Sequence, residues 1–302
     1  MSSKSLRILV LGGHGGLGKA LTRRLDGIGH ITAWSRADLD LSQLDLIAPK
    51  LEAQPFDVLL NSAGMTSPDV CEAQPDLARL VNVDAPERLA ACCQRLGRRF
   101  IHFSTDYVFD GSKTALWSED DPTEPVNHYG KTKHAGEVAV LAAFPQALVA
   151  RVSWLFGPDK PSHPDQIIAK ALEGSALTAI ADKTSAPTFT HDLCDWITSL
   201  IVDHPVVCGT LHLCNEGSAS WQDWGLEALT IAEEMGLPLQ TRSIGPLKLA
   251  ESTFFKAARP PHTTMSTSRL TQLTGIQPRP WQEALRDYLH GKTALAFSLP
   301  RS

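Results

Sequence analysis

The segment Leu6-Arg-Ile-Leu-Val-Leu-Gly-Gly-His-Gly-Gly-Leu-Gly18 begins as an apolar run and ends in a turn that holds five glycines. Residues 19 to 25 then have the composition of a helix, so the segment predicts a strand, a glycine-rich turn and a helix. Glycines at every third position let the backbone turn tightly and approach a pyrophosphate, whose charge the helix N-terminus favours. A glycine turn without a ligand is the less favoured reading. The predicted dinucleotide contacts in this turn are Gly12, Gly15, Leu17 and Gly18.

A second strand is predicted from His30 to Trp34, and the residues after it bear on the choice of cofactor. In a dinucleotide-binding fold an acidic residue here would accept hydrogen bonds from a free ribose 2′-hydroxyl. The chain instead has Ser35 and Arg36, and a guanidinium neutralises a 2′-phosphate, which favours NADPH over NADH. A solvated surface arginine has the same sequence signature, so NADH stays open. Asp40 and Leu41 follow, and we expect the aspartate to hold the adenine amino group.

A third strand, Phe56 to Leu60, opens into Asn61-Ser62-Ala63-Gly64. The small residues Ala63 and Gly64 would let the backbone pass over the cofactor. Helices over residues 75–85 and 86–96 and strands over 100–103 and 146–152 continue the alternation. Strand and helix alternating at this spacing predict an α/β fold with a doubly wound parallel sheet.

The strand at Phe100 ends in Ser104-Thr105-Asp106, and a helix that follows carries Tyr129 and Lys133. These two residues are four apart without an intervening proline, so they share one helix face. We expect the ammonium to lower the pKa of the tyrosine and to make it a proton donor for a carbonyl oxygen. Chance produces such a pair on surface helices, but ligands gather at the carboxyl ends of parallel strands, where Thr105 would lie.

The alternation loosens beyond Gly157, where we predict a second, smaller domain. We assign residues 1–155 to the NAD(P)-binding domain and residues 156–302 mainly to substrate binding, with a segment near 186–214 returning to the first domain. Predicted helices cover 165–173, 191–202, 221–235 and 281–289. Predicted strands cover 177–181, 209–213 and 238–244, and residues 256–269 are expected to form an ordered loop that lines a cleft.

Composition narrows the classes of partner. The net charge of -5 gives no broad basic field, so nucleic acid and anionic membranes are not expected partners. The N-terminus lacks the features of a secretory signal, and no apolar run has the roughly 18 residues of a membrane span. The six cysteines lack a Cys-x-x-Cys spacing, which predicts reduced thiols in a cytoplasmic protein. The eleven histidines show no metal-ligand spacing, so no metal site is predicted.

Three further motifs, taken with the glycine turn, resemble the extended short-chain dehydrogenase/reductases and, within them, the dTDP-4-dehydrorhamnose reductase group. They are Phe103-Ser-Thr-Asp-Tyr-Val-Phe-Asp-Gly111, Tyr129-Gly-Lys-Thr-Lys-His-Ala-Gly-Glu137 and Arg151-Val-Ser-Trp-Leu-Phe-Gly157. The likeness continues through residues 186–192 and Arg259-Pro260 to the helix at Trp281, and so covers essentially the whole chain. It implies a Rossmann domain and hydride transfer from a reduced nicotinamide to the C4 ketone of a nucleotide-linked 6-deoxyhexose.

The resemblance also implies roles for single residues. Tyr129 would donate the proton, Lys133 would in addition hold the nicotinamide ribose, and Thr105 would hydrogen-bond the carbonyl oxygen. The implied substrate contacts are Asp106, Tyr107, Trp154 and Arg259, the last near the substrate phosphates. Trp154 as a core residue and Arg259 as a solvated charge are the plainer alternatives. The resemblance leaves a homodimer open, and an interface magnesium ion in some members, whose ligands have no counterpart that we can place in this chain.

The sugar side departs from the family pattern. Met65 and Pro68 stand where the family commonly has a tyrosine and a valine, and Asp182-Lys-Thr-Ser-Ala-Pro-Thr188 stands for Asp-Gln-x-Gly-x-Pro-Thr. The reaction type is therefore better supported than the substrate. Two alternatives remain: a non-catalytic NADP-binding regulatory subunit, against which the intact Thr105, Tyr129 and Lys133 argue, and a nucleotide-sugar epimerase or dehydratase, which Asp106 keeps open.

Overall fold

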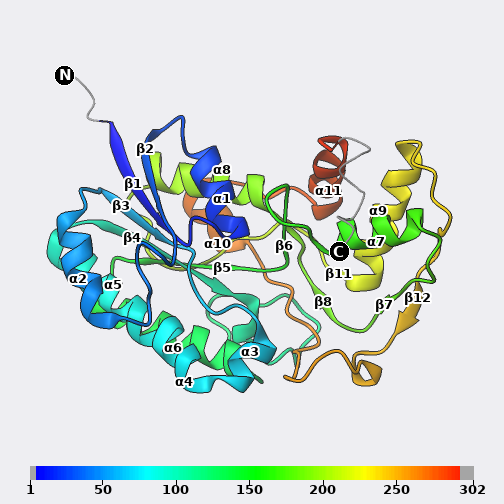
Figure 1. The fold of residues 1–302 in the computed structure, drawn as a ribbon, viewed down its shortest axis with the longest axis horizontal. Helices are drawn as coiled ribbons and strands as arrows, with labels where there is room; N and C mark the ends of the chain where they lie inside the picture. Colours follow the sequence, from blue (N-terminus) through cyan, green and yellow to red (C-terminus); the bar gives the residue numbers. More distant parts are fainter. Residues whose placement is uncertain (1–4, 293–302) are drawn as a thin grey trace.

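The computed structural model describes residues 5–292 and has a six-stranded parallel sheet at its centre (Figure 1). The strand order is β2-β1-β3-β4-β5-β10. Because β1 pairs with β2 on one side and with β3 on the other, the chain reverses its direction of travel across the sheet between β1 and β3. This is the topological switch point at which open α/β sheets bind ligands. The strands are Leu6–Leu11 (β1), Gly29–Trp34 (β2), Val58–Asn61 (β3), Arg99–Thr105 (β4), Leu148–Val152 (β5) and Gly209–His212 (β10).

Helices cover both faces of this sheet, which confirms the predicted doubly wound α/β class (Figure 1). Along β1, Ile8 and Val10 belong to one apolar core, and Leu9 and Leu11 belong to the other, since successive side chains of a strand point to opposite faces. The first core includes side chains of α1 (Gly16–Arg24), α8 (Thr190–Val202) and α10 (Ser268–Thr274). The second includes side chains of α2 (Leu44–Ala53), α5 (Ala85–Leu96) and α6 (His128–Ala143).

Short helical segments lie at the carboxyl edge of the sheet. The helix expected over residues 75–85 is divided into a short α-helix and a π-helical turn, a form that recurs at functional sites. The segments are α3 (Pro68–Ala73), α4 (Pro75–Arg79), the π-helical η1 (Leu80–Asp84) and the 3₁₀-helical η2 (Asp106–Val108).

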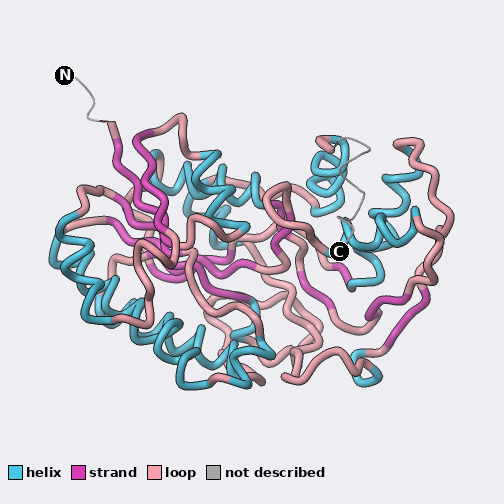
Figure 2. Tube along the Cα trace, in the orientation of Figure 1, coloured by secondary structure: helices cyan, strands magenta, loops and turns pink. Residues whose placement is uncertain are grey.

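A second region, on the right in Figure 1, packs three helices around its own apolar core. These helices are α7 (His163–Leu172), α9 (Trp221–Glu234) and α11 (Trp281–His290). Three two-stranded ladders border them, visible as short magenta segments in Figure 2. The ladders join β6 (Leu155–Phe156) to β9 (Thr188–Phe189), β7 (Thr178–Ile180) to β12 (Gly245–Leu247) and β8 (Thr184–Ser185) to β11 (Ala219–Ser220). A 3₁₀ turn, η3, covers Leu249–Glu251.

The strand expected over residues 238–244 is wrong. These residues form a loop, and the strand of this segment, β12, begins at Gly245. The amides of Gln240 and Thr241 donate to the Ala171 carbonyl near the end of α7, so this backbone is not available for a ladder. Leu239 and Ile244 are buried as loop residues, which produced the apolar pattern.

The segment from residue 186 to residue 214 supplies α8, which packs against α1, and β10, which pairs with β5.

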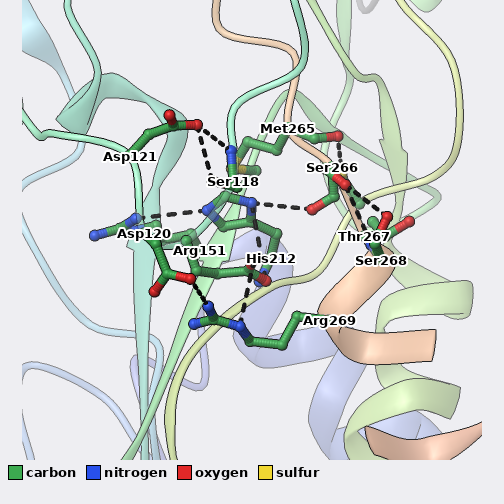
Figure 3. A network of polar contacts seen from close by, with 12 residues as sticks. Ser118, Asp120, Asp121, Arg151, His212, Met265, Ser266, Thr267, Ser268 and Arg269 are labelled. Atoms are coloured by element: carbon green, nitrogen blue, oxygen red, sulfur yellow. Dashed lines mark hydrogen bonds and ion pairs between the residues drawn. The ribbon is translucent and has the colours of Figure 1, made fainter. Parts of the chain in front are cut away.

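Two buried side chains, Arg151 and His212, hold this edge of the sheet to its surroundings (Figure 3). Arg151 on β5 makes a bidentate pair with Glu137 of α6, at 3.0 and 2.7 Å. His212 on β10 donates from Nδ1 to the Ser266 carbonyl at 3.0 Å, and its Nε2 lies 3.5 Å from the Arg151 guanidinium.

Three observations concern features that the sequence predicts to be absent. Among residues 5–292, no helix combines the length and the hydrophobicity that crossing a membrane would need. In the same range no three His, Cys, Asp or Glu side chains are grouped so that they could hold a metal ion. All six cysteines are free thiols.

Candidate active site

A cavity of about 930 Å³ lies at the carboxyl edge of the sheet and extends to α7 and α9. It brings together the predicted cofactor and catalytic residues and three of the four predicted substrate contacts, while Arg259 lies outside its lining. The predicted residues that line it are Gly12, Gly15, Leu17, Gly18, Ser35, Arg36, Asp40, Leu41, Ala63, Gly64, Thr105, Asp106, Tyr107, Tyr129, Lys133 and Trp154.

The glycine turn has its shape because side chains are excluded at two positions. Gly12 has a φ of +77°, and a Cβ there would lie 2.9 Å from the Ala63 amide nitrogen. A Cβ on Gly18 would lie 2.1 Å from the Gly12 carbonyl oxygen. Gly15 is the N-cap of α1 and has no side chain to accept from the first amides of the helix. These amides face the cavity as donors for an anion such as a pyrophosphate.

Lys160 is a cavity residue that the sequence analysis missed. A Cβ on Gly16 would lie 3.2 Å from Lys160 Cβ, so the lysine lies directly over the glycine turn. The loop that carries it is tied to α1 by the ion pair of Arg23 and Asp159 at 2.6 Å. Its sequence surroundings, a proline-rich loop, contain no signal that places it over the turn.

The residues predicted at the adenosine end lie together after β2. Arg36 is 78% exposed and donates from Nε to Asp40 at 3.0 Å. Asp40 also accepts from the backbone and hydroxyl of Ser42, and the backbone bond is the main reason that the pKa of Asp40 is lowered. Ser35 donates its hydroxyl to Asp38 at 2.8 Å. Arg36 is thus at the cavity rim with an exposed guanidinium, whereas the predicted adenine contact of Asp40 stays a prediction.

Asn82, on the π-helical turn η1, fixes the loop after β3 and was also missed as a site residue. Its side chain accepts from the Met65 amide at 2.9 Å, donates to the Met65 carbonyl at 3.0 Å and lies 3.2 Å from the Thr132 hydroxyl. It therefore connects the loop of Ala63 and Gly64 to α6. A buried polar residue inside an amphipathic helix pattern was the signal available in the sequence.

Helix α6 reaches the site because it lacks side chains at two contacts. A Cβ on Gly130 would lie 2.2 Å from the Tyr107 carbonyl oxygen, and a Cβ on Gly136 would lie 2.1 Å from the Asn82 carbonyl oxygen. Asn127 caps the helix by accepting from the Gly130 amide at 2.8 Å. The close approach sets the Tyr129 ring 5.6 Å from the Tyr107 ring, at an interplanar angle of 65°.

The expectation that Lys133 lowers the pKa of Tyr129 is wrong in this structure. Burial raises the pKa of Tyr129 well above 10, and a hydrogen bond from Thr105 opposes this only in part. The Lys133 ammonium is directed elsewhere: Nζ donates to the Phe103 carbonyl at 2.7 Å and lies 3.2 Å from His102 Nε2. The Tyr129 phenol therefore keeps its proton at neutral pH, which is the state that a proton donor requires.

Lys133 is almost fully buried, and burial lowers its pKa to about 8, although the charge of Glu137 opposes the change. His102 is fully buried on β4, and burial together with the charge of Lys133 places its pKa well below 6.5. The imidazole is therefore neutral. The sequence analysis assigned no role to His102, and so missed its contact with Lys133.

Asp106 is held by hydroxyl groups from three segments. Its carboxyl accepts from Thr105 at 3.1 Å, from Ser185 at 2.8 Å and from Thr263 at 2.5 Å. Burial raises the pKa of Asp106, and the charge of Lys183 opposes this increase. Oδ2 thus anchors β8 and the loop at residue 263, while Oδ1 accepts from the neighbouring Thr105.

Lys183, at a position where the resemblance implies a glutamine, is fully buried. Its Nζ donates to the Pro260 carbonyl at 2.6 Å and lies 4.9 Å from the Tyr107 ring and 5.8 Å from the Trp154 ring. Burial lowers its pKa to about 8, while the charge of Asp106 acts in the opposite direction. The substitution therefore places a cation behind two aromatic residues of the cavity wall.

The other two predicted substrate contacts differ in their position. Trp154 lines the cavity and stacks on Trp224 with ring centroids 5.7 Å apart. Its φ is +38°, and no other non-glycine residue among those described has a positive φ. Such a backbone is strained in an L residue. Arg259 instead pairs with Asp69 at 3.0 Å and lies over the Phe255 ring, so a contact with substrate phosphates would require its release and stays a prediction.

Comparison with known proteins gives matches over nearly the whole chain. A family model described as "RmlD substrate binding domain" matches residues 6–293. The chain is 35% identical to the dTDP-4-dehydrorhamnose reductase of Mycolicibacterium smegmatis, over 93% of this chain and 84% of the relative. It is 34% identical to a probable dTDP-4,6-dihydroxy-2-methyloxan-3-one 4-ketoreductase of Streptomyces antibioticus, over 93% of this chain and 94% of the relative. A solved dTDP-4-dehydrorhamnose reductase from Bacillus anthracis, in complex with NADP, superposes with a TM-score of 0.87 at 26% identity, covering 97% of this chain and 100% of that one.

Proposed function

Since the chain belongs to the family of the RmlD substrate binding domain, as the sequence resemblance predicted, we propose that it is an NADPH-dependent reductase. Its substrate on this proposal is a nucleotide-linked 6-deoxy-4-ketohexose, which it reduces at the C4 ketone. One observation carries the proposal: Tyr129 and Thr105 line the same cavity as a glycine turn whose shape suits a dinucleotide.

The residues of the cavity fit NADPH. The amides at the start of α1 and the overlying Lys160 provide an anion site, and Arg36 at the rim suits a ribose 2′-phosphate. The bound cofactor would supply the hydride. The solved reductase with NADP is a relative at TM-score 0.87, which supports the same cofactor here.

The protein groups act on the oxygen of the ketone. Hydride delivery to the carbon leaves negative charge on that oxygen, which a positioned acid must protonate. Tyr129 serves as this acid because burial keeps its phenol protonated. The Thr105 hydroxyl provides a second hydrogen-bonding group when its proton turns from Asp106 to the ketone oxygen. Lys133, one helical turn further along α6, would hold the nicotinamide ribose rather than the phenolate, because its ammonium is directed to the Phe103 carbonyl and His102.

The names of the relatives support a dTDP-linked sugar as the substrate. The two relatives act on different dTDP-ketosugars, and this chain has its own sugar-side residues at Met65, Pro68 and Lys183. We therefore place other nucleotide-linked 4-ketosugars next. The test is to offer such sugars with NADPH to the purified protein and to follow the loss of nicotinamide absorbance. No turnover with any nucleotide sugar, together with normal NADPH binding, would argue for a different carbonyl substrate or for the regulatory reading.

The same assay separates the alternative functions. A reductase consumes NADPH in proportion to substrate, an epimerase or dehydratase recycles its cofactor, and a regulatory subunit does neither. Asp106 bears on the dehydratase, which would need a carboxyl group free to act on the sugar. Its oxygens accept from Thr105, Ser185 and Thr263, which favours a structural role.

Three further expectations remain proposals. The division into residues 1–155 and 156–302 is one, and limited proteolysis would test it. A homodimer is another, which sedimentation analysis would address. The third is a cytoplasmic location, which the free cysteines are consistent with.

A further inference from the structure

His102 is the buried titratable group closest to the catalytic lysine, and the reaction described above gives it no role. It lies on β4, whose side chains alternate, and it points toward α6 together with Phe100. The Lys133 ammonium lies 3.2 Å from its Nε2, and Asn61 of β3 lies 3.0 Å from its Nδ1. Asn61, His102 and Lys133 thus form a continuous polar chain in an otherwise apolar layer.

The surroundings of Lys133 make this contact important. None of the ion pairs formed within residues 5–292 includes Lys133, and the nearby Glu137 is paired with Arg151. The groups that face Lys133 are Tyr129 and Glu137 on its own helix, Cys71 on α3 and His102 on β4. Among the described residues 5–292, only the Phe103 carbonyl and the imidazole lie within hydrogen-bond distance of Nζ. A buried ammonium needs such acceptors to stay charged.

The donors and acceptors around His102 determine its tautomer. An ammonium is a donor only, so His102 must present a lone pair at Nε2. A neutral imidazole with a lone pair at Nε2 carries its proton on Nδ1, and that proton needs an acceptor. A half-turn of the Asn61 carboxamide exchanges its nitrogen and oxygen and supplies this acceptor. A neutral Lys133 has a lone pair that can accept from Nε2, and the Asn61 nitrogen can then donate to Nδ1.

We propose that His102 is a positioning residue of the reductase, which holds the Lys133 ammonium through the Nε2 lone pair of its Nδ1-protonated tautomer. The role of this contact in catalysis rests on the proposed function, whereas the contact itself and its effect on the charge of Lys133 do not. In the unturned orientation, the Asn61 oxygen accepts from the Ala63 amide at 3.3 Å, in the loop assigned to the cofactor. The half-turn of Asn61 gives up this bond, so the orientation of Asn61 couples His102 to that loop.

The test compares two substitutions by NADPH binding as a function of pH, without sugar substrate. His102→Phe keeps an aromatic ring but offers no acceptor, whereas the side chain of His102→Gln places an acceptor near the position of Nε2. Removing an acceptor from an ammonium disfavours its charged form. In His102→Phe we therefore expect NADPH affinity at neutral pH to fall about tenfold to a hundredfold, the scale of a hydrogen bond to a charged group. Its loss of affinity at high pH should also begin at lower pH, and His102→Gln should restore most of both.

A matched control is His212→Phe, which alters another buried neutral histidine, on β10, whose contacts are Arg151 and Ser266. It should lower the thermal stability but leave the pH dependence of NADPH binding in place. A His102→Phe protein with the wild-type profile would overturn the proposal. Should that variant not fold, ¹⁵N NMR of the wild-type histidines decides: a proton on Nε2 of His102, at a pH below the pKa of Lys133, would equally overturn it. Because the assay measures NADPH binding without a sugar, its result does not depend on whether the substrate screen finds a substrate.

Discussion

Replacing Glu137 by glutamine removes one charge from a buried ion pair and leaves the shape of the side chain intact. The Glu137 and Arg151 side chains are 3% and 5% exposed. Burial acts to raise the pKa of Glu137, but His134, whose Nδ1 lies 3.6 Å from Oε2, and the charge of Arg151 hold it at about 2, against an ordinary 4.5. By linkage, that difference corresponds to about 3 kcal/mol of stability at neutral pH. Breaking one side of a buried pair costs about 3–5 kcal/mol in general, so the two arguments agree.

The assay is urea unfolding of Glu137→Gln, Arg151→Met and the double variant at neutral pH. We expect each single variant to lose about 3 kcal/mol with an unchanged m-value, and the double variant to lose clearly less than the sum, because no unpaired charge is left buried. Glu233→Gln is the control, since its pair with Arg242 is about 60% exposed and such pairs contribute below about 1 kcal/mol. The sign in pH follows from the lowered pKa: this stability is present above pH 4.5 and is lost as the pH falls toward 2. A Glu137→Gln loss under about 1 kcal/mol, or strict additivity in the double variant, would refute the reasoning.

Four further outcomes are expected. Tyr129→Phe should lower turnover by ~10²–10⁴ with NADPH affinity nearly intact, because only the proton donor is lost, and near wild-type turnover in steady-state assays would exclude that role. Lys133→Met should weaken NADPH binding as well as turnover, and fluorescence titration showing unchanged affinity would argue against its contact with the ribose. Arg36→Ala should narrow the preference for NADPH over NADH roughly tenfold to a hundredfold, whereas equal affinities for the two cofactors in the wild type would remove the basis of this prediction. Burial lowers the pKa of His212 to about 3 from 6.5, so the free energy of unfolding should fall by up to about 1.4 kcal/mol per pH unit as the pH drops between these values. In urea unfolding curves measured across this pH range, His212→Gln should reduce that dependence on pH. An unchanged dependence would contradict the assignment to His212.

The sheet was predictable because its strands are buried on both faces. Val58–Asn61 and Leu148–Val152 are buried at every position, and a continuous apolar run next to a helix pattern is a local signal. The small ladders of the second region offer no such signal. Strands β8 and β11 have two residues each and pair across more than 30 positions of the chain, so neither periodicity nor a hairpin turn marks them. Apolar loop residues there, such as Leu239, were accordingly assigned to a strand.

At the site, the sequence predicted most of the residues that line the cavity but not their environments. The spacing of Tyr129 and Lys133 placed both on one face of α6, yet the sign of the pKa shift of Tyr129 depends on burial, which spacing does not report. Asn82 and His102 were missed as site residues for a related reason. Each is one polar residue inside an apolar pattern, and its function appears only when a third element, the β3 loop for Asn82 and α6 for His102, packs against it.

The two halves of the site are held by different kinds of contact, which explains why the catalytic residues match the family pattern while the sugar side does not. Tyr129 is located by backbone contacts of α6, since Gly130 and Gly136 lie against the Tyr107 and Asn82 carbonyl groups with no room for a side chain. Changing a glycine there would move the helix and with it the proton donor. Lys183 instead meets its surroundings through the end of a side chain, so a change at this position need not displace α6. Substrate choice can therefore diverge while the geometry of proton transfer stays fixed.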